Sequence, residues 1–431
     1  MLLLHLSDIH FRKGEIGTAM DPNAHLRAEL LRDAEERCTA IGCAPDAVLF
    51  SGDIAFAGDP EEYAFATTWL EELCRRCGTS LSAVFTIPGN HDVVRDIAGR
   101  RLIQTIHRGI KANDEITLEG TLRGLLTDPE TARLLYEALG PYNQFASQFF
   151  CDLLPPERTI AKRDLRLNDG SVLRLSGFNS AFVSSAADTP FPPSLFVDPA
   201  CFQLQKERGV EHLVACHHPY SWLKQGDALR DFLNDVARFQ LFGHEHTNRI
   251  EPGRDWVRVA ASAAHPDKTE RGWEPGYNLL ELSVATDAGR RIMNVGVHVR
   301  VWQTRPGQFR AKMDGPNDVF RQKIELDDWT PPSPTMLPGN TAAEMVEIGP
   351  AADPEAVRID PMDSLRDISV RFFRLTLSQK SAIAGKLKLL EEDDANQPDF
   401  ERFRRAFIRA RERELVEELD REVKAATSEG R

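Results

Sequence analysis

The stretch VFTIPGNHD, residues 84–92, joins a short apolar run to a turn that carries an amide, an imidazole and a carboxylate. The apolar run predicts a buried strand, which ends at the Pro-Gly pair. The side chains that follow, Asn90, His91 and Asp92, are of the kinds that bind metal ions or transfer protons. This stretch therefore predicts a strand that delivers chemically useful residues at its carboxyl end.

The same arrangement occurs four more times in the first 246 residues. The apolar runs are 2–6, 47–50, 212–216 and 239–242, and the polar clusters that follow them are Asp8-Ile-His10, Gly52-Asp53, His217-His218-Pro219 and Gly243-His244-Glu245-His246. Helical patterns at 23–41 and 61–77 separate the first three strands. Such alternation predicts parallel pairing with right-handed crossovers, and ligands then collect at the carboxyl edge of the sheet.

Each cluster taken alone has an ordinary explanation. Asp8 and Asp53 would cap helices, and the glycines would serve tight turns. That explanation gives no reason for residues of ligand type at five strand ends in a row. A pair of divalent metal ions, by contrast, needs such a set of oxygen and nitrogen donors. We therefore expect a two-metal site.

These motifs, in this order, resemble those of the calcineurin-like metallophosphoesterase family over residues 1–305. The resemblance implies an α/β fold, a four-layer α/β/β/α sandwich of two mixed sheets flanked by helices. It also implies two divalent metal ions, for which manganese, iron and zinc are all suited, with manganese expected in vitro. Residue by residue, it assigns one ion to Asp8, His10 and His246, the other to Asn90, His217 and His244, and both to Asp53.

In the family pattern His91 is not a ligand, although it follows the ligand Asn90. Metal binding lowers the pKa of water from 15.7 toward about 7, so a hydroxide held between the ions would attack phosphorus in line. We expect His91 to serve as general acid for the leaving group and Asp92 to orient its imidazole. The His-x-Pro arrangement favours His217 as the ligand and leaves His218 to orient that ligand or to contact substrate.

Residues 95–167 interrupt the alternation with a helical pattern, which we interpret as an insertion near the metal edge that selects the substrate. Arg95 and His25 are close in sequence to the site loops and are candidates for substrate contact, although a surface role is the simpler interpretation. The segments 256–261, 277–284 and 292–302 are typical of antiparallel strands, and we expect them to complete a second sheet behind the site.

The chain changes character after residue 329, where the catalytic domain (1–329) is expected to end. Residues 330–363 are rich in proline and predict a semi-extended linker. Residues 364–427 are helical in pattern, with a capping box at 376–379. The segment FFRLTLSQ, residues 372–379, and the helices after it loosely resemble effector-associated adaptor domains of bacterial conflict systems. That resemblance implies an all-α protein-interaction module with a protein partner.

The composition sets further bounds. A formal net charge of −13 disfavours nonspecific binding to long duplex nucleic acid. The start of the chain does not have the pattern of a signal peptide, and there is no apolar run of the roughly 18 residues that cross a bilayer, so we expect a cytoplasmic protein without a membrane partner. Seven cysteines predict buried free thiols rather than a zinc site built from Cys38, Cys43, Cys74 and Cys77.

The first functional hypothesis is a dinuclear metal-dependent phosphodiesterase that hydrolyses a nucleotide or a nucleic-acid end. Two alternatives stay open: a phosphomonoesterase, including a phosphoprotein phosphatase, and a scaffold that keeps its metals for structure while the C-terminal helices bind a partner. An intact His91 argues against the scaffold, because a structural site has no need of an acid beside its metals.

Overall fold

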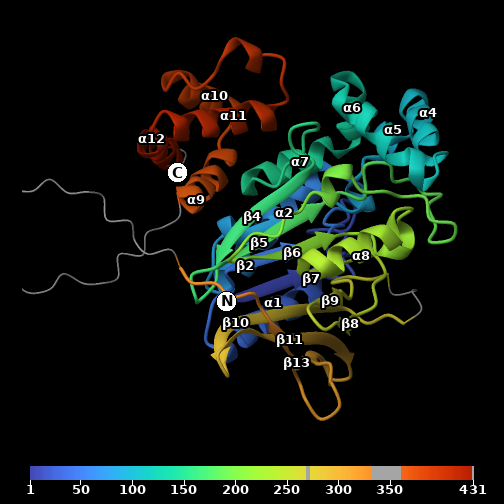
Figure 1. The fold of residues 1–431 in the computed structure, drawn as a ribbon. Coiled ribbons are helices and arrows are strands. Elements are labelled where there is room, and N and C mark those ends of the chain that lie inside the picture. Colours follow the sequence, from blue (N-terminus) through green and yellow to red (C-terminus); the bar gives the residue numbers. More distant parts are fainter. Residues whose placement is uncertain (268–271, 332–360, 430–431) are drawn as a thin grey trace, which may run out of the picture.

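The computed structural model describes residues 1–267, 272–331 and 361–429 (Figure 1). Two mixed sheets pack face to face, and helices flank them, which confirms the predicted sandwich. Gly177 in the second sheet leaves room for Phe85 in the first, since a Cβ there would lie 3.1 Å from the Phe85 ring. Most of the predicted linker at 330–363 lies outside the described residues.

The first sheet has the order β12-β11-β10-β1-β2-β3, with β13 paired to β11. Its strands are β1 (Leu2–Leu6), β2 (Ala47–Phe50), β3 (Val84–Thr86), β10 (Gly276–Asp287), β11 (Arg290–Thr304), β12 (Gly307–Ala311) and β13 (Phe320–Glu325). β1, β2 and β3 are parallel and buried along their whole length, as expected of strands that are covered on both faces.

The second sheet has the order β4-β5-β6-β7-β9-β8. Its strands are β4 (Ile160–Arg166), β5 (Val172–Phe178), β6 (Val210–Cys216), β7 (Ala237–Phe242), β8 (Arg249–Pro252) and β9 (Val257–Ala260). The four central strands are parallel, and the edge strands β4 and β8 are antiparallel to their neighbours.

Two details of the predicted fold are wrong. β10 and β11 were expected in a second sheet, yet β10 pairs antiparallel with β1 and extends the first sheet, while β9 joins the second sheet parallel to β7. The predicted helical insertion at 95–167 is helical only as far as Phe149, because β4 occupies its last part. Alternation along a strand identifies its buried face but not the strand that pairs with it.

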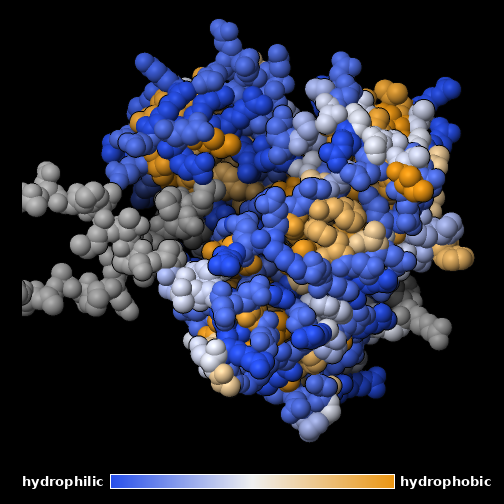
Figure 2. Space-filling model, viewed as in Figure 1, coloured by the Kyte–Doolittle hydropathy of each residue, from blue (hydrophilic) through white to orange (hydrophobic). Residues whose placement is uncertain are grey.

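The helices lie outside the sheets and at one end of them (Figure 1). Their bounds are α1 (Ala24–Ile41), α2 (Pro60–Arg76), α3 (Arg95–Ala98), α4 (Arg101–Lys111), α5 (Glu115–Thr127), α6 (Pro129–Tyr136), α7 (Gly140–Ala146) and α8 (Gly226–Val236). Figure 2 shows hydrophobic side chains on the surface over α4–α6, where Leu102 and Ile116 are exposed. No helix of the described residues is both long and apolar enough to cross a bilayer.

A four-helix C-terminal module packs beside α7 (Figure 1). Its helices are α9 (Pro361–Phe373), α10 (Leu377–Lys386), α11 (Asp399–Glu412) and α12 (Val416–Glu429). The module and the two-sheet region exchange core residues: Val370 of α9 belongs to the large hydrophobic core, and Phe150 belongs to the core of the module. Phe150 packs edge-on against Phe407 with the ring centroids 5.8 Å apart.

Ion pairs at low exposure reinforce this contact. The fully buried Asp152 carboxylate lies 2.6 Å from Arg158 and 2.5 Å from Arg404 of α11, and Arg158 also pairs with Glu401 at 2.6 Å. Arg404 in turn lies over the Phe150 ring. One buried carboxylate therefore joins a loop of the two-sheet region to the module.

Replacing Asp152 by alanine should destabilise the protein by about 3 kcal/mol, because removal of one partner leaves buried charge uncompensated. Urea unfolding measures this loss. Glu119→Ala, which breaks the exposed pair with Arg123, is the control and should cost less than about 1 kcal/mol. Equal losses in the two variants would contradict the structural role given to Asp152.

Candidate metal centre

Five loops converge where the two sheets meet. They follow β1, β2 and β3 of the first sheet and β6 and β7 of the second, and they carry all five polar clusters. The sequence placed these clusters at strand ends, but it did not show that they come from two sheets. The site therefore exists only when both sheets are assembled.

The backbone of these loops is unusual. Of the non-glycine residues with positive φ, five are candidate ligands: Asp8 (52°), His10 (50°), Asp53 (55°), His244 (69°) and His246 (54°). Each such residue costs about 1–3 kcal/mol, although aspartate and histidine tolerate the conformation better than most. Gly89 is required by space, because a Cβ there would overlap Asp53. These backbone conformations lower the stability of the fold, and they orient the candidate ligands toward one another.

Asp8, His10 and His246 form the first donor group, in which one ligand atom from each residue lies within 4.8 Å of the others. The buried Oδ1 atom of Asp8 has no hydrogen-bond partner among the described residues, and Nε2 of His246 lies 3.3 Å from it. A buried carboxylate oxygen without a donor is costly. A bound cation would satisfy it.

His217, His218 and His244 form the second donor group within the same 4.8 Å limit. Nδ1 of His217 lies 2.8 Å from the Ser51 carbonyl, which can only accept, so Nδ1 carries the proton. Nε2 then faces the Asn90 side-chain oxygen at 3.1 Å. The backbone thereby fixes the His217 ring with Nε2 toward the donor residues, where a bound metal ion would take the place of the proton on that nitrogen.

Asp53 joins the two groups. Its Oδ2 atom lies 3.2 Å from His10 Nε2 and 3.3 Å from His217 Nε2. Burial disfavours the charged carboxylate, but His217 and His10 outweigh this and hold the pKa of Asp53 well below its usual value. The carboxylates, imidazoles and Asn90 amide together form a donor set that suits two divalent ions of intermediate hardness.

His91 lies beside this donor set, and its ring is fixed by backbone. Nδ1 donates to the Phe56 carbonyl at 2.8 Å, and the ring stacks on Phe56 with centroids 5.0 Å apart. The backbone N–H of His91 donates to Asp53 Oδ1 at 2.7 Å. Burial lowers the pKa of His91, Asp53 opposes that shift, and the charge of Arg95 adds to it. Proton exchange with a substrate is thereby directed to Nε2.

Asp92 does not orient the His91 ring, contrary to the prediction. Its carboxylate instead accepts hydrogen bonds from five donors: the backbone N–H groups of Asp53, Ile54, Ala55 and Gly89, and the hydroxyl of Tyr63. Burial, together with the charge of Asp53, raises the pKa of Asp92 to about 6. Asp92 therefore holds the loops after β2 and β3 together, and Phe56 takes the orienting role.

Sequence reasoning missed two supporting residues on α2. Tyr63 lies within the helical pattern at 61–77, which predicts only a packed helix position, yet its hydroxyl donates to Asp92 Oδ1 at 2.8 Å. Glu62 completes a capping box with Asp59 and also accepts the backbone N–H of Phe56 at 3.0 Å. The sequence signal for this was Asp-Pro-Glu-Glu at 59–62, a capping pattern that also fixes the loop that orients His91.

Two further histidines were candidates for substrate contact. His218 is buried beside the donor residues, and His25 lies on α1. His218 is 1% exposed, its Nδ1 atom lies 2.8 Å from the Ser180 hydroxyl, and its ring lies 4.5 Å from that of His244. It is therefore packed among the donor residues rather than presented to substrate. His25 packs edge-on against Trp302.

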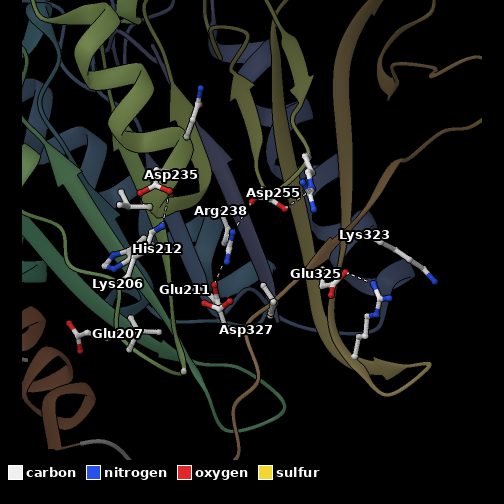
Figure 3. A pocket seen from close by; sticks show the side chains of 17 residues that line it. Lys206, Glu207, Glu211, His212, Asp235, Arg238, Asp255, Lys323, Glu325 and Asp327 are labelled. Atoms are coloured by element: carbon white, nitrogen blue, oxygen red, sulfur yellow. Dashed lines mark hydrogen bonds and ion pairs between the residues drawn. The ribbon is translucent and has the colours of Figure 1, made fainter.

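A cavity of about 650 Å³ lies at the amino ends of β6 and β7, the opposite edge from the donor groups (Figure 3). Its charged side chains pair with one another, as in Arg238 with Glu211 at 3.0 Å and Lys206 with Asp235 at 2.7 Å. Because these charges already satisfy each other, the cavity gives no indication of a ligand.

Two curated relatives share a short segment with the chain. A glycerophosphodiester phosphodiesterase of Enterobacter lignolyticus is 37% identical over 94 residues, which are 21% of this chain and 30% of that protein. A cAMP/cGMP dual specificity phosphodiesterase of Mycobacterium tuberculosis is 36% identical over 93 residues, 21% of this chain and 27% of that protein. The chain thus matches less than a third of the length of these relatives.

Broader comparisons cover more of the chain. The zinc complex of Vps29 from Entamoeba histolytica aligns with 75% of this chain and 99% of its own, at 11% identity and a TM-score of 0.28. Residues 364–425 match the GTPase-associated adaptor domain, which agrees with the adaptor-like module expected from the sequence. Residues 1–248 match the calcineurin-like phosphoesterase model and include all five polar clusters. The chain belongs to the calcineurin-like phosphoesterase family.

Proposed function

We propose that the protein hydrolyses phosphodiesters with two divalent metal ions, and that its substrate is a nucleotide or a nucleic-acid end. The observation that carries this proposal is the position of Asp53 Oδ2, about equally far from Nε2 of His10 and Nε2 of His217. One carboxylate oxygen thereby links His10, which follows a strand of the first sheet, with His217, which follows a strand of the second. The glycerophosphodiester and cyclic nucleotide phosphodiesterases named above, which share a segment with the chain, support the choice of a diester.

The ligand roles follow the family pattern, in which Asn90, 3.1 Å from Nε2 of His217, takes the place of the buried His218. Asp8, His10 and His246 would hold one ion, Asn90, His217 and His244 the other, and Asp53 both; of the ions that suit these donors, manganese is our first choice. When bound, the ions activate water and neutralise charge on the phosphate oxygens.

His91 would supply the proton. Its Nδ1 atom is held by the Phe56 carbonyl, so the ring exchanges a proton at Nε2 without turning. Its backbone N–H binds the Asp53 carboxylate, which fixes the distance between the acid and the donor groups. The imidazole is therefore placed to protonate the leaving oxygen as the ester bond breaks.

We also infer that the C-terminal module binds a protein partner and that the protein acts in the cytoplasm. The match of residues 364–425 to an adaptor domain supports the first inference. Only part of the module surface is used within the chain, since α9 and α11 face the catalytic region. Among the described residues, α10 and α12 make their main contacts within the module, so their outer faces would be the surface that meets another protein.

His91→Ala should keep bound metal and lower kcat by roughly 10²- to 10⁴-fold, the range typical of a lost general acid. Asp53→Ala should instead lose metal, because it removes the oxygen shared by both donor groups. Elemental analysis and steady-state kinetics of the two variants measure these effects. His25→Ala, an exposed histidine on α1, is the matched control and should change neither property. Equal metal loss in His91→Ala and Asp53→Ala would contradict the roles assigned.

A substrate panel distinguishes the three functional hypotheses. With manganese, the protein should hydrolyse bis(p-nitrophenyl) phosphate and single-stranded oligonucleotides faster than p-nitrophenyl phosphate. EDTA should abolish this turnover, and added manganese should restore it, because the donor groups hold the ions that activate water. Turnover of monoesters alone would favour a phosphomonoesterase. No turnover, with the biological role kept in His91→Ala, would favour the scaffold.

A further inference from the structure

A second cavity, of about 220 Å³, opens beside the metal centre between α3, α4 and the loop after β5. One of its lining residues is Asn90, whose side-chain oxygen lies 3.1 Å from Nε2 of His217. Arg95, Gln104 and Ser184 form other parts of the wall. A group bound here would therefore lie next to a phosphate held at the donor groups.

The cavity contains a polar group that needs a partner. Ser184 is 3% exposed, and its hydroxyl makes no hydrogen bond with any described residue. A buried hydroxyl without a partner costs about 1–3 kcal/mol. The hydroxyl lies just beneath the cavity wall, so a small rotation of the Ser184 side chain would bring it to a ligand oxygen or hydroxyl and recover that energy.

Arg95 provides a positive charge at the same place. It is exposed, forms no ion pair within the described ranges, and its charge acts on His91. The neighbouring Arg100, by contrast, pairs with Glu137 at 2.5 Å. A guanidinium without a carboxylate partner is well suited to bind a phosphate through two hydrogen bonds.

The wall formed by the loop after β5 is fixed rather than loose. Asp188 accepts hydrogen bonds from Ser185 and Ser194 and pairs with Lys111 at the end of α4. Lys224 donates to the Lys111 carbonyl at 2.6 Å. These contacts anchor the loop that carries Ser184 and Ser185 to the end of α4.

We propose that this cavity binds the nucleoside next to the scissile phosphate and that Arg95 binds the following phosphate, so that a single-stranded nucleic-acid end is the preferred substrate. The proposal rests on the proposed phosphodiesterase function. The volume is below the about 300–1,000 Å³ of pockets that enclose a whole drug-sized ligand, so the cavity admits a single nucleoside but not a folded phosphoprotein segment. A cyclic mononucleotide has no second phosphate for Arg95.

Calorimetry of the manganese-loaded protein tests this with three probes: thymidine 3′,5′-bisphosphate, thymidine 3′-monophosphate and inorganic phosphate. Arg95→Gln should weaken binding of the bisphosphate about tenfold or more, as expected for a charge-assisted hydrogen bond, and weaken the monophosphate much less. Arg101→Gln, an exposed arginine of α4 outside the cavity, is the matched control and should change neither affinity. Ser184→Val should weaken both thymidine nucleotides but not inorganic phosphate.

Equal effects of Arg95→Gln on the two nucleotides would overturn the role of Arg95, and unchanged nucleotide affinity in Ser184→Val would overturn the nucleoside subsite. The proposed function fails separately. If the wild-type protein hydrolyses diesters but binds the two nucleotides equally well, only the subsite is wrong. If it hydrolyses no diester yet binds the bisphosphate through Arg95, the subsite stands and the catalytic proposal is wrong.

Discussion

The placement of the Asp53 carboxylate is the constraint on which the rest of the site depends. One oxygen faces His10 and His217, and the other accepts the backbone N–H of His91. His10 follows a strand of the first sheet and His217 a strand of the second, so both sheets must end at the same level for this contact to form. The carboxylate thus fixes the relative position of the two halves of the sandwich.

Holding that carboxylate requires a second one. Asp92 accepts the N–H of Asp53 and of Gly89, and so ties the loop after β2 to the loop after β3. Tyr63 and Glu62 extend the support to α2, where helix capping and loop positioning use the same side chains. The strained backbone at Asp53 persists because the hydrogen bonds of Asp92, together with their support from α2, hold the loop in that conformation. The hydrogen bonds that position the Asp53 carboxylate are therefore the same ones that hold the loops after β2 and β3 together.

The sequence predicted the five strand ends and the donor residues because both depend on local information: apolar runs and side-chain chemistry. It could not predict that β10 pairs with β1, since pairing is a long-range choice. It also assigned the orientation of His91 to Asp92, the nearest carboxylate in sequence. The group that orients the ring is the carbonyl of Phe56, and a backbone carbonyl has no residue identity that a motif can display. The left-handed conformations at Asp8 and Asp53 could not be predicted either, because a positive φ at a non-glycine residue is not marked by the residue type.

The exchange of Phe150 and Val370 between the two hydrophobic cores has a consequence for how the protein is made. During synthesis the chain leaves the ribosome from its amino end, and domains generally fold in that order. All strands of the two sheets are synthesised before α9 and α11. Until those helices are translated, Phe150 and the Asp152 carboxylate lack their contacts in the module. A nascent chain that stops short of α9 and α11 would therefore leave Phe150 and the Asp152 carboxylate without the contacts that cover them in the folded protein.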